Sequence, residues 1–148
     1  MIAKFTKADL DKWWPSLQAT ASDFYSEIVQ SNGQLATDSF HGYLAAKLAD
    51  GTLHCFALWL DGVPSEVIGC IKYPDPYTGR PCCLILFWWL SSRHNISAKL
   101  YLEAHAWALG EKCHKLIASC PINGKDVSAS GFYNRLGFEP KEVAFVRY

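Results

Sequence analysis

The sequence predicts an α+β protein with a mostly antiparallel sheet, and three observations lead to this class. Helical patterns fill most of the chain between residues 7 and 49, and strand patterns then dominate up to residue 90. Turn signals separate these strands, which favours antiparallel pairing of neighbours. Residues 82–90 are apolar without alternation, as expected for a strand buried on both faces in the middle of a sheet. Helices and antiparallel strands that share one core define the α+β class.

The first part of the chain predicts one strand and then helices. Residues 1–6 alternate apolar and polar side chains, which is typical of a strand. Thr6 is the expected N-cap of the helix that follows, and Pro15 predicts a boundary or a kink within that helix. Further helices are expected over residues 22–30 and 38–49, the latter with Asp38 as its N-cap.

The rest of the chain predicts strands joined by turns and by one long helix. Asp61-Gly62 is a hairpin signal, and the three prolines of residues 74–81 predict a long turn. Strands are expected over residues 53–60, 67–73, 82–90, 116–120 and 143–148, and helices over residues 96–114 and 127–136.

The composition limits the class of protein. A chain of 148 residues is expected to form one domain, spanning residues 1–148. The formal net charge of zero disfavours a nucleic-acid partner, and the low charge favours a homo-oligomer or an assembly partner. No apolar run is long enough to span a bilayer, and the N-terminus has no apolar leader. We therefore expect a cytoplasmic protein without a membrane partner.

Six cysteines are present, and none forms a pair with the two-residue spacing of zinc or thioredoxin sites. This spacing predicts free, buried thiols and no metal site.

Residues 128–139 are the most informative stretch, because a short helix there is expected to end at a glycine and turn directly into a strand. The segment resembles the last helix of the GNAT superfamily of N-acetyltransferases, in which an Ala-x-x-Phe-Tyr-x-x-x-Gly-Phe pattern recurs. The matching residues are Ala129, Phe132, Tyr133, Gly137 and Phe138. The order of elements is also that of the family, which implies a central sheet with helices on both faces.

The resemblance implies transfer of an acetyl group from acetyl-CoA to an amine, on a small molecule or a protein, by direct attack. Tyr133 matches the tyrosine that protonates the departing CoA thiolate in many members, and a phenol is a reasonable general acid. The alternative role of Tyr133 is that of a half-buried residue at a helix end.

The expected pyrophosphate site is the junction between strand 82–90 and the long helix, because free N–H groups at a helix start bind anions. The family pattern there is Gln/Arg-x-x-Gly-x-Gly/Ala; Arg93 matches its first place, Ala98 its last, and Ile96 stands in the place of a glycine. The candidate cofactor-binding residues are Arg93, His94, Asn95, Ile96, Ser97 and Ala98, together with Asn123 and Asp126. In the alternative reading, Asn95 or Ser97 caps the helix and Arg93 is a solvated charge.

Two questions stay open at the level of sequence. No carboxylate lies on strand 82–90, so the general base is unassigned; the candidates are Glu66, Glu103, His41, His54 and His94. Trp88 and Trp89 must face opposite sides of the sheet. One is expected to fill the core under the long helix, and the other to line an acceptor cleft or a contact with another chain.

An alternative function belongs to another class: a non-catalytic GNAT-fold module, used for structure or interaction, that has lost CoA binding. Ile96 in the glycine place, the missing base, the zero net charge and the many aromatic residues favour it. Compact GNAT-like proteins also occur in bacteriophage genomes, so a phage-encoded protein is part of this alternative.

Overall fold

The computed structural model describes residues 1–29, 36–90, 98–118, 131 and 133–140. A five-stranded sheet runs through this part of the chain in the order β1-β2-β3-β4-β5. The strands are β1 (Ile2–Phe5), β2 (Leu53–Leu60), β3 (Val63–Pro74), β4 (Pro81–Leu90) and β5 (Leu116–Ala118), and the helices are α1 (Lys7–Val29), α2 (Thr37–Ala49) and α3 (Ala98–Gly110). Strands β1 to β4 pair antiparallel, and β4 pairs parallel with β5. The predicted α+β class with a mostly antiparallel sheet is confirmed.

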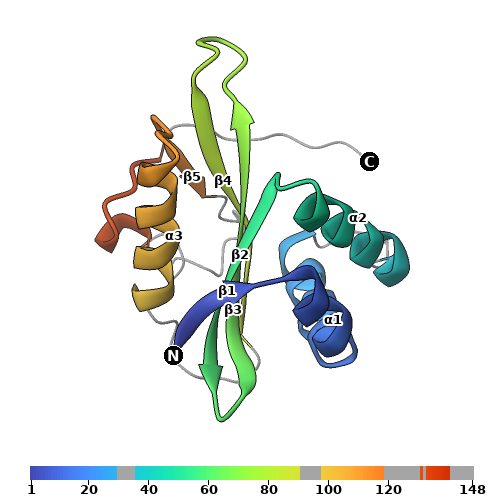
Figure 1. Ribbon diagram of the computed structural model, residues 1–148. Helices are drawn as coiled ribbons and strands as arrows, with labels where there is room; N and C mark the ends of the chain where they lie inside the picture. The colour runs from blue at the N-terminus through green and yellow to red at the C-terminus, as the bar shows by residue number, and fades with distance from the viewer. Residues whose placement is uncertain (30–35, 91–97, 119–130, 132, 141–148) are drawn as a thin grey trace.

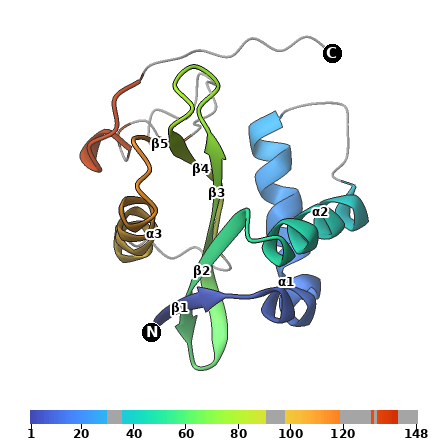
Figure 2. The ribbon, with the colours of Figure 1, turned by 45° about the horizontal axis from the view of Figure 1, so that its top comes forward.

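Helices cover both faces of the sheet (Figure 1). Helices α1 and α2 lie on one side, which we call the α1/α2 face, and α3 lies on the other, which we call the α3 face. The described helical residues near Tyr133 also lie on the α3 side (Figures 1 and 2). The two faces therefore carry different cores and different chemistry.

Helix α1 begins as predicted but does not end at Pro15. The Thr6 and Asp9 side chains bond each other's backbone N–H groups, at 2.8 Å for the Thr6 N–H and 3.2 Å for the Asp9 N–H, as in a capping box. The two helices expected on either side of Pro15 form one helix in the structure. Its two parts run in different directions (Figure 2). Proline has no backbone N–H, so one hydrogen bond of the helix is missing at Pro15. The apolar side chains of α1 pack against the sheet, and this packing offsets the loss.

Helix α2 begins one residue earlier than predicted, so the N-cap assignment of Asp38 is wrong. Ala36 occupies the N-cap position, without a side-chain hydrogen bond, and Asp38 lies in the first turn. A carboxylate in that turn is still favourable, because it faces the positive end of the helix dipole.

The hairpin between β2 and β3 confirms the Asp61-Gly62 signal. Asp61 and Gly62 have φ angles of 51° and 77°, the left-handed conformation that a two-residue hairpin requires. Strand β3 therefore begins at Val63, four residues before the predicted start at residue 67.

A bulge interrupts the pairing of β3 with β4. Gly69 lies opposite Phe87 but Cys70 lies opposite Ile85, so Leu86 is the additional residue on β4. The bulge explains why the β4 sequence lacks simple alternation around this point.

Helix α3 is shorter than the predicted helix 96–114, and its last helical residue is Gly110. Lys112 has a φ of 59°, and the Cys113 N–H donates to the Ala108 carbonyl at 3.0 Å. This left-handed closure ends the helix early and leads the chain toward β5. No described helix has both the length and the apolar character needed to cross a membrane.

Each face of the sheet has its own core. The α1/α2 face is packed with large apolar side chains, among them Phe5, Leu10, Trp14, Leu44, Phe87 and Trp89. The α3 face contains Ile68, Cys70, Cys83, Ile85, Leu100, Tyr101, Ala104 and Ala108. Trp88 packs against this second core and Trp89 belongs to the first, so the prediction that the two indoles face opposite sides is confirmed.

Candidate functional site

The candidate site is the edge of β4 that continues past its pairing with β5. The parallel pairing covers three positions, from Cys83↔Leu116 to Ile85↔Ala118. Strand β4 then extends to Leu90, and on its other edge it stays paired with β3 as far as Glu66↔Leu90. We call β4 residues 86–90 the open edge, because no described strand pairs with it on the β5 side. Its outward backbone groups can bind an extended ligand, as a strand edge does.

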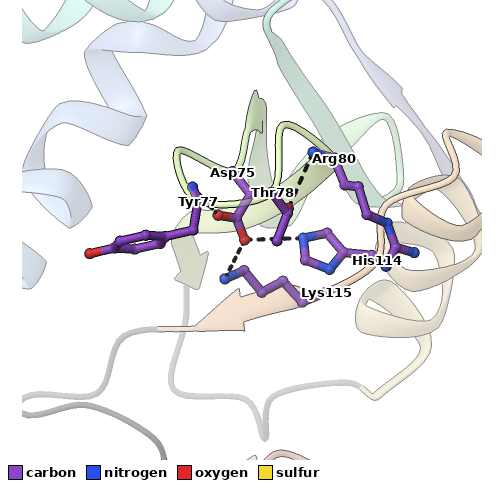
Figure 3. A network of polar contacts seen from close by, with 6 residues as sticks. All are labelled: Asp75, Tyr77, Thr78, Arg80, His114 and Lys115. Carbon is purple, nitrogen blue, oxygen red and sulfur yellow. Dashed lines mark hydrogen bonds and ion pairs between the residues drawn. The ribbon is translucent and has the colours of Figure 1, made fainter.

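A polar network joins the β3–β4 hairpin to the residues before β5 (Figure 3). Asp75 is only 3% exposed, and its carboxylate lies 2.8 Å from Lys115 Nζ and 3.2 Å from His114 Nε2. The backbone N–H of Tyr77 donates to the same carboxylate at 2.9 Å. The backbone N–H of His114 donates to the Pro81 carbonyl at 2.9 Å, and this bond aligns the start of β5 with β4. The network therefore fixes the start of the β4–β5 pairing, and the open edge begins where that pairing ends, after Ile85↔Ala118.

The same contacts favour the ionised form of Asp75. The hydrogen bond from Lys115, followed by the bond from the Tyr77 backbone, lowers the pKa of Asp75 to about 2. The carboxylate is charged at neutral pH, and its partners are cationic or polar. We assign this network a structural role in joining the two strands.

On the α3 face, a buried carboxylate holds Trp88. The Trp88 indole N–H donates to Glu66 Oε1 at 2.6 Å, and Glu66 is 3% exposed. The Trp88 ring stacks on Tyr101 of α3, with ring centroids 6.4 Å apart. Glu66 therefore has a defined function in the structure, which is to accept the indole hydrogen bond near the start of β3.

Tyr133 joins the same aromatic layer. Gly137 has a φ of 88°, so the predicted helix stop is confirmed, and the Phe138 N–H donates back to the Tyr133 carbonyl at 3.1 Å. This turn folds Phe138 against Tyr133, with centroids 5.4 Å apart, and places it 5.7 Å from Tyr101. The ring contacts thus link Tyr133 through Phe138 and Tyr101 to Trp88 of the open edge.

On the α1/α2 face, the open edge carries a stack of aromatic rings. Phe87 lies over Gly69, so closely that a Cβ at Gly69 would clash with the Phe87 ring. Trp89 stacks on Phe87 with centroids 3.9 Å apart and planes inclined by 16°, and Phe40 of α2 meets its edge at 6.0 Å. The Trp89 ring is 2% exposed, and its Nε1 has no hydrogen-bond partner. Trp88 and Trp89 are neighbours in sequence, yet one indole N–H is bonded and the other is not.

The cysteines that the structure describes are free thiols, and four of them are buried: Cys55, Cys70, Cys82 and Cys83. A hydrogen bond with Cys83, together with burial, raises the pKa of Cys70. A thiol whose pKa is raised in this way is a poor nucleophile at neutral pH, so Cys70 is not a candidate nucleophile.

Most of the predicted cofactor-binding residues lie outside the described residues. These are Arg93, His94, Asn95, Ile96, Ser97, Asn123 and Asp126. Ala98 is described and is the exposed first residue of α3, and residues 91–97 separate it in sequence from the end of β4. The predicted start of the long helix is thus close to the observed one.

The candidate bases are spread over the molecule. Glu103 is exposed on α3, and His41 lies 3.1 Å from Asp11 between α1 and α2. His54 stacks on Trp107 with centroids 4.4 Å apart, and burial lowers its pKa. Glu66 is the candidate beside the open edge, on the same face as Tyr133.

Two features of the site were missed at the level of sequence. The Asp75 network joins the β3–β4 turn to His114, which lies 39 residues later in the sequence. No local pattern indicates such a contact. The unpartnered donor of Trp89 also depends on its tertiary surroundings; the apolar run of β4 indicated only that the ring is buried.

Comparison with solved structures identifies the architecture. The chain has the GNAT acetyltransferase fold. It is similar over its whole length to a ribosomal-protein-alanine N-acetyltransferase from Brucella melitensis biovar Abortus 2308, with 17% identity, a TM-score of 0.71 and 97% of that chain covered. A GNAT family acetyltransferase from Staphylococcus aureus matches with 12% identity, a TM-score of 0.70, and coverage of 100% of this chain and 97% of the other.

An aminoglycoside N-acetyltransferase, AAC(6')-Iy in complex with CoA, also matches. The identity is 17% and the TM-score 0.64, with 100% of this chain and 98% of that chain covered. No protein-family model matches the sequence, and no curated protein is significantly similar to it. At these identities the matches establish the GNAT fold that the sequence resemblance implied.

Proposed function

We propose that the protein is an acetyl-CoA-dependent N-acetyltransferase that transfers the acetyl group to an amine by direct attack. The observation that carries the proposal is the open edge of β4, which continues past the last β4–β5 pair at Ile85↔Ala118. An extended acyl-carrying arm can bond to its outward backbone groups in the way that a peptide adds to a sheet edge. The GNAT fold, which one solved relative uses in a complex with CoA, supports this assignment.

The cofactor is assigned to the residues that the family pattern indicates and to the open edge. We assign the pyrophosphate to the start of α3, with residues 93–98 as its binding segment and Arg93 as the cation. Asn123 and Asp126 are assigned to the CoA arm. Backbone groups of β4 residues 86–90 orient the reacting end of that arm.

Tyr133 is assigned as the general acid. When bound, acetyl-CoA supplies the acyl group as a thioester. The nitrogen of the neutral amine attacks the carbonyl carbon, the new C–N bond forms, and the C–S bond breaks with its electron pair on sulfur. The Tyr133 hydroxyl gives its proton to that sulfur, and the proton released by the amine nitrogen passes to solvent, from which Tyr133 is reprotonated. The position of Tyr133 in the aromatic layer of Trp88 and Tyr101 supports this role.

The first test is calorimetric titration with acetyl-CoA, followed by an assay for released CoA thiol with a panel of amines. We expect binding, and we expect Tyr133→Phe to lower kcat about 100-fold while the acetyl-CoA Kd stays within about two-fold, because general acid catalysis contributes 10²–10⁴. Tyr77→Phe is the matched control, since Tyr77 is 95% exposed on the β3–β4 hairpin. Absence of any heat and of any thermal shift with acetyl-CoA would remove the proposal.

A second candidate function is a GNAT-fold binding or assembly module without catalysis, and the observation that favours it is Ile96 in the glycine place. A β-branched side chain there narrows the backbone conformations open to the phosphate-binding turn. Ile96→Gly separates the two functions. If the variant binds acetyl-CoA and the natural chain does not, the protein is a non-catalytic module; equal binding by both supports the enzyme.

A further inference from the structure

We infer that the Trp89 indole N–H is a binding group for the acceptor molecule, on the α1/α2 face of the open edge. The inference rests on the proposed function and specifies its substrate. The acceptor class is a primary amine with a flat apolar body that carries a hydroxyl or carbonyl oxygen, and this oxygen accepts the hydrogen bond from Trp89 Nε1.

The starting observation is a buried donor without a partner. Among the buried side-chain nitrogen and oxygen atoms that the structure describes, Trp89 Nε1 alone has no hydrogen-bond partner. Burying an amide-like or indole N–H without an acceptor is costly, and proteins rarely retain such a group unless a ligand or water satisfies it. Trp88, the next residue, shows the usual arrangement, because its N–H is satisfied by Glu66.

The place of the donor in the fold connects it with the acceptor. Trp89 lies on the open edge, where the reacting arm is assigned, and its ring belongs to the α1/α2 core. Tyr133, assigned to the leaving sulfur, lies on the opposite, α3 side, because its ring contacts Phe138, which in turn contacts Tyr101 of α3. An amine that attacks the carbonyl from the face away from this acid therefore approaches on the side of Trp89.

The side chains around Trp89 define the chemistry of the ligand. Its ring stacks on Phe87 and meets Phe40, so the neighbouring surface is flat and apolar. Phe40 is partly buried and contacts the Trp89 ring, so we assign the ligand's approach to the indole to the Phe40 side of this core. The two buried carboxylates that the structure describes lie elsewhere: Glu66 bonds Trp88 on the other face, and Asp75 belongs to the β3–β4 hairpin. Among the described residues, none offers a polycation a buried counter-charge at this wall, so the aminoglycosides of the solved relatives are not the expected class.

The experiment follows the six indole N–H signals of the full-length protein in a heteronuclear NMR spectrum. Trp89→Phe assigns the Trp89 signal by its disappearance; if that variant does not fold, proton contacts to the Phe40 and Phe87 rings assign it in the natural protein. The probes are phenylethanolamine, phenethylamine, which lacks the hydroxyl, and spermidine, a polycation. We expect phenylethanolamine to move the Trp89 signal more than phenethylamine does, and spermidine to leave it in place. The Trp88 signal is the internal control and stays unmoved.

The kinetic arm separates this inference from the proposed function. With phenylethanolamine, Trp89→Phe is expected to raise the acceptor KM about ten-fold, the effect of one lost hydrogen bond, while the KM for acetyl-CoA is unchanged. With phenethylamine the two proteins are expected to have the same KM. Acetyl transfer together with a Trp89 signal that no probe moves would overturn the inference and leave the enzyme. A Trp89 signal that moves in a protein unable to bind acetyl-CoA would support the ligand site and remove the enzyme. A shift with spermidine as large as with phenylethanolamine overturns the ligand class.

Discussion

The two faces of the sheet use similar residues in different ways. Both are rich in aromatic rings, and each receives one indole from the pair Trp88 and Trp89. On the α3 face the indole N–H is bonded to a buried carboxylate, and the ring is part of a layer that reaches Tyr133. On the α1/α2 face the rings stack directly, and the donor of Trp89 is unpartnered. A face whose polar groups are satisfied is suited to holding its side chains in place, whereas an unsatisfied donor is suited to recognition.

The largest expected effect is on the α3 core. Leu100 is fully buried, so we expect Leu100→Ala to lower the free energy of unfolding by about 3 kcal/mol, from lost transfer energy and the cavity left behind. Leu102 is on the same helix but 58% exposed, so Leu102→Ala is expected to change the free energy of unfolding by less than about 0.5 kcal/mol. Urea unfolding followed by circular dichroism measures both. Equal losses would contradict the assignment of the two helix sides.

A smaller effect is expected from the ring stack on the other face. Gly69→Ala places a Cβ against the Phe87 ring, and we expect the free energy of unfolding to fall by about 2 kcal/mol through overpacking. Gly42 is the matched control, because a Cβ there meets nothing within 4 Å. Gly42→Ala is expected to stabilise helix α2 by about 0.5–1 kcal/mol. If Gly69→Ala were as stable as the natural chain, the close approach of Phe87 to β3 would be wrong.

The pair of indoles tests the comparison directly. Trp88→Phe removes a donor and leaves the Glu66 carboxylate buried, at a cost of about 1–3 kcal/mol beyond the lost ring volume. Trp89→Phe loses a similar volume but no hydrogen bond, so without ligand it is expected to destabilise less. Thermal and urea unfolding of the two variants give the difference. Trp89→Phe proving the less stable of the two would contradict this expectation.

The smallest expected effect lies at the hairpin network and depends on pH. The pKa of Asp75 is lowered to about 2 in the folded protein, below the ordinary value near 3.9, so its carboxylate contributes stability that is fully present above about pH 4. That contribution is lost as the pH falls through about 2. Asp75→Asn should therefore lower Tm by a few degrees at pH 7, and the difference from the natural protein should shrink between pH 4 and pH 2. A difference that is constant over this range would exclude the charge of Asp75 as its cause.

Much of the fold follows from local patterns. Strand β2, the Asp61-Gly62 turn, the apolar strand β4 and the stop at Gly137 agree with the sequence, because periodicity and glycine conformation act over a few residues. The differences have the same origin. Pro15 predicts a boundary or a kink, and the structure has one continuous helix whose two parts run in different directions (Figure 2), because contacts of α1 with the sheet hold the helix together. Gly110 and the left-handed Lys112 end α3 before the apolar pattern ends.

The candidate site was less predictable than the fold. Sequence indicated Tyr133 and the start of α3 through a family pattern, and it indicated that Trp88 and Trp89 diverge, because neighbouring strand residues always do. It did not indicate which indole would find an acceptor, since Glu66 lies 22 residues before Trp88. Nor did it indicate the contact between Asp75 and Lys115. Asp75 lies in the turn between β3 and β4, and Lys115 lies between α3 and β5.

The amino-acid order alone therefore decided the kinds of elements, their order, and the alternation of side chains along each strand. These depend on backbone preferences and on spacings of two to four residues. The folded chain decided which side chain meets which partner: that Trp88 reaches a carboxylate, that Trp89 does not, and that β4 runs beyond β5. Such pairings join distant positions, and they form only when packing of the whole sheet brings those positions together.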